Sequence, residues 1–327
     1  MTSGRLFLMC RRGCRILSLL ILAVTLRLAA QAAPKAAEGF ALLDAGKPEA
    51  AREVFESNLR NNPSNAEAQQ GEVKASETLA LQERSAGHMV EALRALMRAR
   101  EFAPRNAHLL SDLGILEEEM KLYPDAEKAL ALSQQIDPSN LDNYYAMARV
   151  KMDEGQLDVA EQNMHVYLQS RPDDAGAHYG LGRIYELGMQ FDKAKLEFRR
   201  SLELSPVQTE SWYELGDMAL KQNDYDDALT DFHRVLARDG RHGGALAGSG
   251  QALFREKRYD EALEYLRRAI AAAPDYQPGH YYLGLTLSRL GQKEESDREL
   301  LAAQKLADEE NRNAGRRYQL SQAPPAQ

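Results

Sequence analysis

Two stretches of equal length decide the fold: residues 177–206, AHYGLGRIYELGMQFDKAKLEFRRSLELSP, and residues 211–240, SWYELGDMALKQNDYDDALTDFHRVLARDG. The numbering of the two stretches differs by 34. The places that they share hold a Leu-Gly pair, an alanine and a phenylalanine: Leu181-Gly182 and Leu215-Gly216, Ala194 and Ala228, Phe198 and Phe232. An internal repeat with this period therefore organises this part of the chain.

The same period continues on both sides of these stretches. Proline recurs at Pro104, Pro138, Pro172, Pro206 and Pro274, with Gly240 in the remaining place, and alanine recurs at Ala126, Ala160, Ala194, Ala228 and Ala262. A bulky apolar column runs through Leu130, Met164, Phe198, Phe232, Leu266 and Leu300. The pattern predicts two antiparallel helices per unit, with Gly or Ala where they cross and proline after the second helix. Each helix pair has an apolar face that it buries by stacking on its neighbours.

The chain resembles the tetratricopeptide repeat family, whose unit is a helix–turn–helix of roughly 34 residues. The resemblance implies an all-α fold, a right-handed α-solenoid of about eight stacked repeats that covers residues 33–308. The repeats are expected to start near residues 32, 66, 107, 141, 175, 209, 243 and 277. Trp212 falls in a column with Leu110, Tyr144, His178, Leu246 and His280, which predicts a packing role for it.

One repeat is longer than the others. Pro63 and Pro104 are 41 residues apart, which is seven more than the period. Seven residues correspond to about one extra turn in each of two antiparallel helices, at roughly 3.6 residues per turn. We therefore expect an extended hairpin at about residues 66–103, either a neutral insertion or a contact site for a partner.

The first thirty-two residues differ from the rest. Residues 1–15 carry four arginines and no acid, residues 16–26 form an apolar run, and Ala30-Gln31-Ala32 resembles a cleavage site. This pattern predicts a signal peptide over residues 1–32, or an uncleaved N-terminal anchor. The protein is then exported, periplasmic or secreted. At the other end, residues 309–327 are expected to form a polar tail that is partly disordered.

Removing the leader changes the charge and the cysteine content. The formal net charge of −8 becomes −8 − 5 = −13, because five arginines and no acids leave, and both cysteines, Cys10 and Cys14, leave with them. Such an acidic chain is a poor candidate for binding nucleic acid or anionic lipid, so no membrane contact is expected beyond the possible anchor.

The sequence contains no signature of an enzyme, a cofactor or a metal site. It lacks the His-Glu-x-x-His, Gly-x-Ser-x-Gly and phosphate-loop patterns. The run NDYDDA (223–228) lacks the glycine and the distal glutamate of a calcium loop, and the glycines of GGALAGSGQ (243–251) are interpreted as close-packing positions. We therefore expect no catalytic residues, no metal and no cofactor, so the protein is not expected to be an enzyme.

Two columns of the first helices identify a candidate binding surface. Tyrosine occurs at Tyr145, Tyr179, Tyr213 and Tyr281. The position four residues further along the helix holds Arg149, Arg183 and Asp217 in the first three of these repeats, and Gln251 in the repeat between those of Tyr213 and Tyr281. A step of four keeps both columns on one helix face. In the family this face lines the concave groove, so the resemblance implies that these eight residues bind a protein or peptide segment. The alternative is that the tyrosines only pack between repeats.

These observations predict a non-catalytic, exported scaffold for protein–protein interaction. The alternative function is an accessory or regulatory subunit of an envelope enzyme or assembly machine. Tyrosine would supply rigid contact area, and Arg149 and Arg183 would select carboxylates or stack on aromatic rings. The family's subclass that grips chaperone tails carries Lys and Asn in these places, so the Tyr and Arg pairs here argue against that role.

Overall fold

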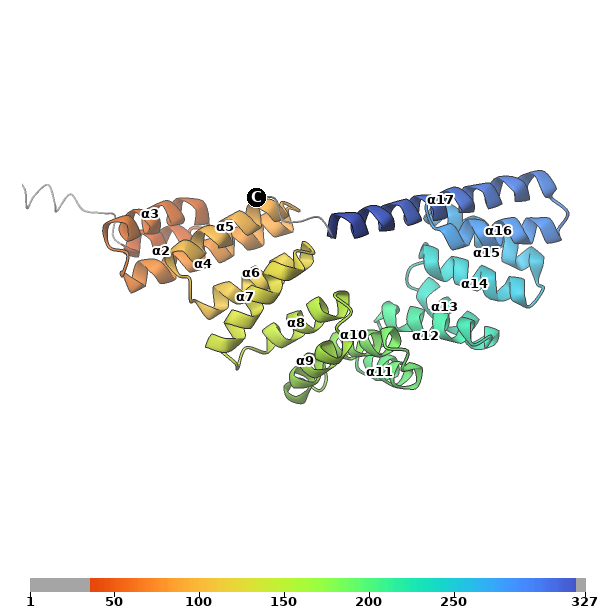
Figure 1. Cartoon of the computed structure of the whole chain (residues 1–327), viewed down its shortest axis with the longest axis horizontal. Helices are drawn as coiled ribbons and strands as arrows, with labels where there is room; N and C mark the ends of the chain where they lie inside the picture. The colour runs from red at the N-terminus through yellow and green to blue at the C-terminus, as the bar shows by residue number, and fades with distance from the viewer. Residues whose placement is uncertain (1–35, 322–327) are drawn as a thin grey trace, which may run out of the picture. The chain divides into compact units, whose positions relative to one another are not determined.

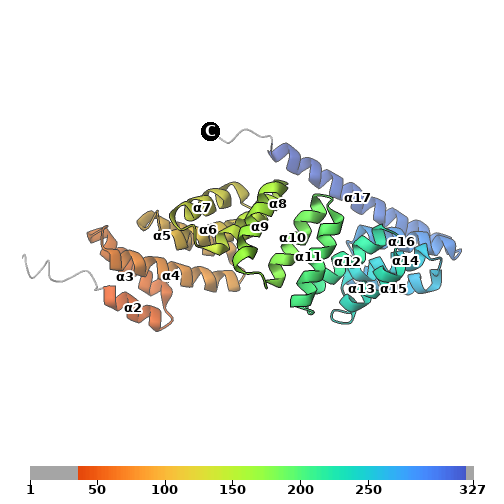
Figure 2. The same cartoon turned by 90° about the horizontal axis from the view of Figure 1, so that it is seen from below.

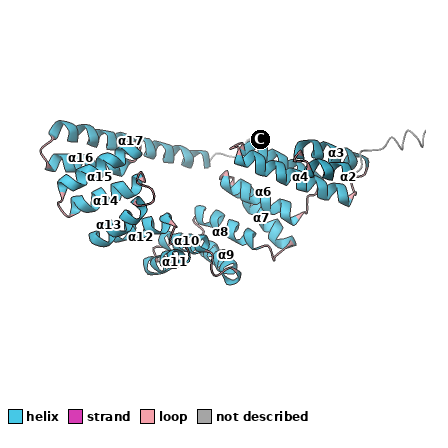
Figure 3. Ribbon diagram, turned by 180° about the vertical axis from the view of Figure 1, so that it is seen from behind, coloured by secondary structure: helices cyan, strands magenta, loops and turns pink. Residues whose placement is uncertain are grey.

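The computed structural model describes residues 36–321, with side chains to residue 312. All regular structure in this range is α-helical, without a strand (Figure 3). The predicted leader, residues 1–32, and the last six residues of the predicted tail lie outside the described residues. Within the described range, no helix combines the length and the apolar character needed to cross a membrane.

The chain divides into two compact units, residues 1–155 and 156–327. The helices of the first unit, from the red end of Figure 1, are α2 (Ala36–Asp44), α3 (Pro48–Asn61), α4 (Ala66–Ser85), α5 (Met89–Phe102), α6 (Ala107–Glu119), α7 (Tyr123–Ile136) and α8 (Leu141–Asp153). The division falls between α8 and α9, two helices that the repeat register places in one repeat.

The second unit continues the same alternation of first and second helices (Figures 1 and 2). Its helices are α9 (Leu157–Ser170), α10 (Ala175–Leu187), α11 (Phe191–Leu204), α12 (Thr209–Lys221), α13 (Tyr225–Leu236), α14 (Gly243–Arg255), α15 (Tyr259–Ala272), α16 (Gln277–Arg289) and α17 (Lys293–Ser321). From α4 onward, every first helix begins within a residue of the predicted repeat start. The fold is the all-α solenoid that the repeats predict.

Capping side chains and turn residues with positive φ mark where the helices begin and end. Asn65, Asn106, Asn140 and Asp174 cap first helices by accepting a hydrogen bond from a backbone N–H of the first turn. Every turn inside a repeat contains one residue with positive φ: Gly46, Gly87, Lys121, Gly155, Met189, Asn223, Lys257 and Gly291. Glycine adopts this left-handed conformation without strain, and half of the turns use it.

Phe232 shows how the bulky column builds the core of the second unit. Its ring is 1 % exposed and packs against Gly216 of its own repeat and Gly248 of the next. A Cβ atom would lie 2.9 Å from the ring at Gly216 and 2.5 Å at Gly248, so neither position has room for a side chain. Close packing therefore explains the glycines of the 243–251 run. Phe55 occupies the same place in the first unit, between Gly39 and Gly71.

The seven extra residues lie in α4 alone, not one turn in each helix as the sequence suggested. α4 has 20 residues, whereas the other first helices from α6 to α16 have 13, and α5 has the usual 14. Seven residues are close to two turns at about 3.6 residues per turn, so the insertion preserves the buried face of the helix. Ala68 and Ala75 pack with Phe55, while Val73 and Ala80 pack with Leu96.

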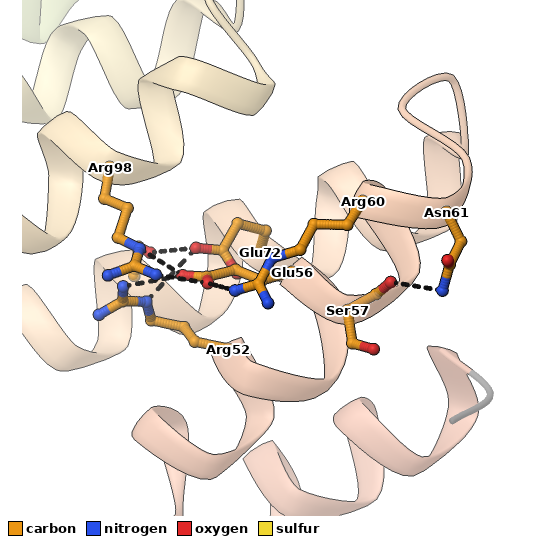
Figure 4. Close-up of polar contacts among 8 residues, drawn as sticks. Arg52, Glu56, Ser57, Arg60, Asn61, Glu72 and Arg98 are labelled. Carbon is orange, nitrogen blue, oxygen red and sulfur yellow. Dashed lines mark hydrogen bonds and ion pairs between the residues drawn. The ribbon is translucent and has the colours of Figure 1, made fainter. Parts of the chain in front are cut away.

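α4 also contributes a carboxylate to a buried group of charges (Figure 4). Glu72 is fully buried, and Arg52 contacts both Glu72, at 3.3 Å, and Glu56, at 3.2 Å. Arg98 of α5 also pairs with Glu56, at 2.5 Å. Burial raises the pKa of Glu72 to about 7, although Arg52 opposes this shift. Glu56 is also desolvated, but Arg98 and Arg52 together hold its pKa below the usual value.

Candidate partner-binding face

The predicted site residues all lie on first helices, and we call the solvent-accessible side of these helices the first-helix face. Within the first unit, α8 carries Tyr145 and Arg149. Within the second unit, α10 carries Tyr179 and Arg183, α12 carries Tyr213 and Asp217, α14 carries Gln251, and α16 carries Tyr281. Arg149 and Tyr281 are exposed and the other six are half-buried.

A network of charges joins α10 and α12 in the second unit. Glu214 is 6 % exposed and accepts hydrogen bonds from Arg183, at 2.5 Å, and from the hydroxyl of Tyr179, at 3.5 Å. Burial raises the pKa of Glu214, and the positive charge of Arg183 counteracts this shift. Arg183 therefore neutralises a buried carboxylate of its own protein.

The network extends along the same face through Lys221. Its ammonium group lies 2.6 Å from Asp217 and 3.5 Å from Glu186, and Glu186 lies 3.4 Å from Arg183. The network thus connects the predicted residues Tyr179, Arg183 and Asp217. The side chains that connect them, those of Glu214, Glu186 and Lys221, were not part of the two columns.

Arg149 has a similar role in the first unit. It pairs with Glu118 of α6 at 3.0 Å, and Glu118 is 4 % exposed. Burial raises the pKa of Glu118, with Arg149 as the main opposing charge. Both predicted arginines therefore pair with buried carboxylates of neighbouring helices of their own chain, and their selection of a partner's carboxylates or aromatic rings stays a prediction.

Tyr213 is packed between repeats. Its ring lies 5.9 Å from the ring of Phe232 and 5.1 Å from that of His242, and it leaves no room for a Cβ at Gly244. Burial is the main cause that raises the pKa of its hydroxyl, and Tyr276 adds to the effect. The structure thus gives Tyr213 the packing contacts of the alternative interpretation.

Trp212 is more accessible than a packing residue of the core. It is half-buried, and the guanidinium of Arg234 stacks over its ring at 3.9 Å. The ring lines a hollow of about 520 Å³ between α11, α12 and α13, together with the acidic Asp227 and Asp231. His178 and His280 lie in the same column as Trp212. Each ring contacts a glutamate of a second helix through Nδ1, at 2.6 Å, and the carbonyl oxygen of a proline in the preceding turn through Nε2.

Tyr281 borders a hollow of about 520 Å³ on the first-helix face of α14 and α16. Its side chain is 42 % exposed, and the hollow is also lined by Phe254, Arg255, Tyr282, Leu285 and Arg289. The sequence-based columns missed the two arginines. The signal was present, because Lys221, Arg255 and Arg289 are spaced by the repeat period and end successive first helices.

The first unit has its own hollow on this face, of about 320 Å³ between α4 and α6. Glu77, Leu81, Arg84, His108, Asp112 and Ile115 are among the residues that line it. The two columns of candidate binding residues began at Tyr145 and did not reach this region, where the seven-residue insertion lengthens α4. Leu81 is 64 % exposed and occupies the place that Arg149 and Arg183 hold in later repeats.

Three side chains in this hollow have the residue types of metal ligands. Glu77, His108 and Asp112 offer one atom each, all within 4.8 Å of one another. His108 Nδ1 lies 2.8 Å from Glu77 and 3.7 Å from Asp112. The hydrogen bond to Glu77 raises the pKa of His108, and burial raises the pKa of Asp112 to about 6. An ion pair between His108 and Glu77 accounts for this arrangement without a cation.

Comparisons with known proteins agree with the fold. A family model described as tetratricopeptide repeat matches residues 145–209, 189–230 and 213–276. The chain is similar to a tetratricopeptide repeat protein from Parabacteroides merdae, with a TM-score of 0.57 and 16 % identity over 72 % of this chain and 93 % of the other. It is also similar to PilF of Pseudomonas aeruginosa, with a TM-score of 0.56 and 19 % identity over 64 % of this chain and 96 % of that one.

A third similar structure is a chain of the Cut9–Hcn1 hetero-tetramer of the APC/C, with a TM-score of 0.59 and 16 % identity over 83 % of this chain and 52 % of that one. A search of curated proteins finds no match. The matched repeats and the helix pairs that continue on either side of them are similar to those of tetratricopeptide repeat proteins, and the structural comparisons support the same fold.

Proposed function

We propose that the protein is a non-catalytic, exported scaffold that binds a segment of a partner protein along its first-helix face. The match of residues 145–276 to the tetratricopeptide repeat model supports a role in protein–protein interaction, because tetratricopeptide arrays present stacked first helices to peptides and proteins. The predicted leader over residues 1–32 supports the export.

The observation that carries the proposal is the exposure of large apolar and aromatic side chains beside hollows on this face. Leu81 in the first unit and Tyr281 in the second are 64 % and 42 % exposed, and each borders a hollow with charged groups. Exposed apolar area next to a few polar groups is the usual composition of a recognition surface.

The test is co-purification of partners with a tagged protein from the envelope or secreted fraction. A Leu81→Asp, Tyr281→Asp double variant places a charge on the first-helix face of each unit without touching a buried carboxylate. We expect it to lose the partners that the wild type retains. A variant of Arg183 or Tyr213 is less suitable, because both side chains contact buried groups of the protein.

A matched control carries the same change on second helices. Leu196 of α11 is 65 % exposed and Val90 of α5 is 54 % exposed, so a Leu196→Asp, Val90→Asp double variant alters the same apolar character elsewhere. Partners that survive the first double variant, or that disappear equally with the second, contradict the proposal. Export is tested separately by N-terminal sequencing, with a start near Ala33 expected and an intact Met1 excluding cleavage.

A further inference from the structure

The hollow between α14 and α16 has a charge that sets it apart from the rest of this acidic protein. Arg255 and Arg289 line it, and none of its lining residues is an aspartate or a glutamate. Four other hollows in the described part of the chain each contain at least two carboxylates. The hollow is therefore a local positive site on a chain with a formal net charge of −8.

Both guanidinium groups are available for a ligand. Each is exposed, and neither makes an ion pair with a carboxylate among the described residues. Arg255 donates a hydrogen bond to the hydroxyl of Tyr282 at 3.3 Å, which orients its side chain toward the aromatic rings. The contrast is Lys221, the preceding cation of the same repeat column, which Asp217 and Glu186 neutralise.

The aromatic residues form a rigid wall beside these charges. The rings of Tyr281 and Tyr282 meet edge to face with centroids 5.3 Å apart, and Tyr282 meets Phe254 at 5.8 Å. Leu285 adds apolar surface one turn after Tyr281. Pre-ordered rings supply contact area at a low cost in conformational entropy, and guanidinium groups pair with carboxylates through two parallel hydrogen bonds.

We propose that this hollow, which we call the Arg–Tyr hollow, binds an acidic segment of the partner protein, one whose glutamate or aspartate side chains are interleaved with apolar or aromatic ones. Arg255 and Arg289 pair with the carboxylates, and Tyr281 and Leu285 cover the intervening apolar side chain. Cations in the last turn of a helix also favour the helix dipole, but that interaction requires no aromatic wall. This inference rests on the proposed function and adds the chemistry of the bound segment.

The test measures fluorescence anisotropy of the full chain with a fluorescein-labelled peptide in which glutamate alternates with phenylalanine and leucine. We expect the peptide to bind at least about tenfold more tightly than its Glu→Gln counterpart, because the paired charges are removed. An Arg255→Gln, Arg289→Gln double variant should lose about tenfold in affinity, and Tyr281→Ala should lose several-fold.

The control removes two exposed arginines outside the hollow. An Arg238→Gln, Arg241→Gln double variant makes the same change in net charge and should bind the acidic peptide within about twofold of the wild type. Circular dichroism and thermal unfolding check that each variant folds. A loss of affinity equal to that of the Arg255 and Arg289 variant would show a general charge effect and would overturn the assignment.

Other outcomes overturn it as clearly. Equal affinity for the Glu and Gln peptides, no binding up to about 1 mM, or tighter binding of an oligothymidine than of the acidic peptide each contradict an acidic protein segment as the occupant. Partner capture by the full chain distinguishes the two proposals. If Leu81→Asp, Tyr281→Asp abolishes capture while Arg255→Gln, Arg289→Gln does not, the first-helix face binds partners but this chemistry is wrong.

Discussion

The two units use the same helix pair but differ in how many charged side chains they bury. As far as the units are described, the first buries Glu56, Glu72, Glu117, Glu118 and Lys151, whereas the second buries one carboxylate, Glu214, and His280; both units also bury small hydroxyl residues, such as Ser133 and Ser201. Burying an ion pair costs desolvation that pairing only partly returns. The comparison predicts equal apolar cores in the two units, with a larger electrostatic and pH-dependent contribution in the first.

The apolar cores can be compared through Phe55 and Phe232, which fill the same place in the two units and are both fully buried. Each Phe→Ala change should destabilise its own unit by about 3–5 kcal/mol. Trp212 is the only tryptophan, so its fluorescence during urea unfolding reports on the second unit, while circular dichroism reports on both. A much smaller loss for Phe55→Ala would show that the apolar cores themselves differ.

The contribution of the buried ion pairs to stability is tested by substituting Arg52, with a substitution of Arg200 as the matched control. Each arginine contacts two carboxylates, but Glu56 and Glu72 are buried whereas Asp173 and Glu203 are exposed. Arg52→Ala should cost about 3 kcal/mol at pH 8, because it leaves the buried Glu72 without the arginine that pairs with it, although Glu56 keeps Arg98. Arg200→Ala should change stability by less than about 0.5 kcal/mol. Similar losses for the two variants would remove the proposed difference between the units.

The period predicted the starts of the first helices from α4 onward, because the packing residues of each helix pair recur once per repeat. Gly216 and Phe232 illustrate this, since the crossing of two helices admits only a small residue opposite a large one. The placement of the insertion did not follow from the pattern. Seven residues keep the same helix face in contact whether they extend one helix or two, and only the contacts of Ala68 and Ala80 distinguish the outcomes.

The ion pairs were not predictable from the columns. Arg149 pairs with Glu118 of the preceding repeat, whereas Arg183, in the same place one repeat later, pairs with Glu214 of the following one. A long arginine side chain can reach the first helix before its own or the one after it. Its partner therefore depends on which of these helices carries a carboxylate within reach. The columns therefore placed the predicted residues on the first helices without revealing which of their charges are already neutralised, and their role in binding stays a prediction.

Glu117 should make the stability of the first unit depend on pH. It is 6 % exposed, and burial, with Asp125 nearby, raises its pKa to about 7 from the ordinary value of 4.5. The folded state therefore binds a proton that the unfolded state has lost, so the contribution to stability is present below about pH 4.5 and disappears as the pH rises through about 7. The first unit should become less stable between pH 5 and pH 8.

A Glu117→Gln variant should remove this part of the pH dependence. We expect it to stabilise the first unit by about 1–2 kcal/mol at pH 8 and by little at pH 4.5, where the wild-type carboxyl is already neutral. Urea unfolding followed by circular dichroism at both pH values provides the measurement, and the fluorescence transition of Trp212 should not move. A gain of the same size at pH 4.5 would show that titration of Glu117 is not the cause.

The smallest expected effect concerns the turns, where the two units should behave alike. Met189 has a φ of 57° and is 76 % exposed, so its side chain contributes little packing while its backbone adopts a left-handed conformation that glycine tolerates better. Met189→Gly should raise the free energy of unfolding of the second unit by about 0.5–1 kcal/mol. Lys121→Gly, with a φ of 60°, is the matched change in the first unit and should give a similar gain. A loss at Met189 and a gain at Lys121 would mean that the Met189 side chain, despite its exposure, stabilises the turn of the second unit.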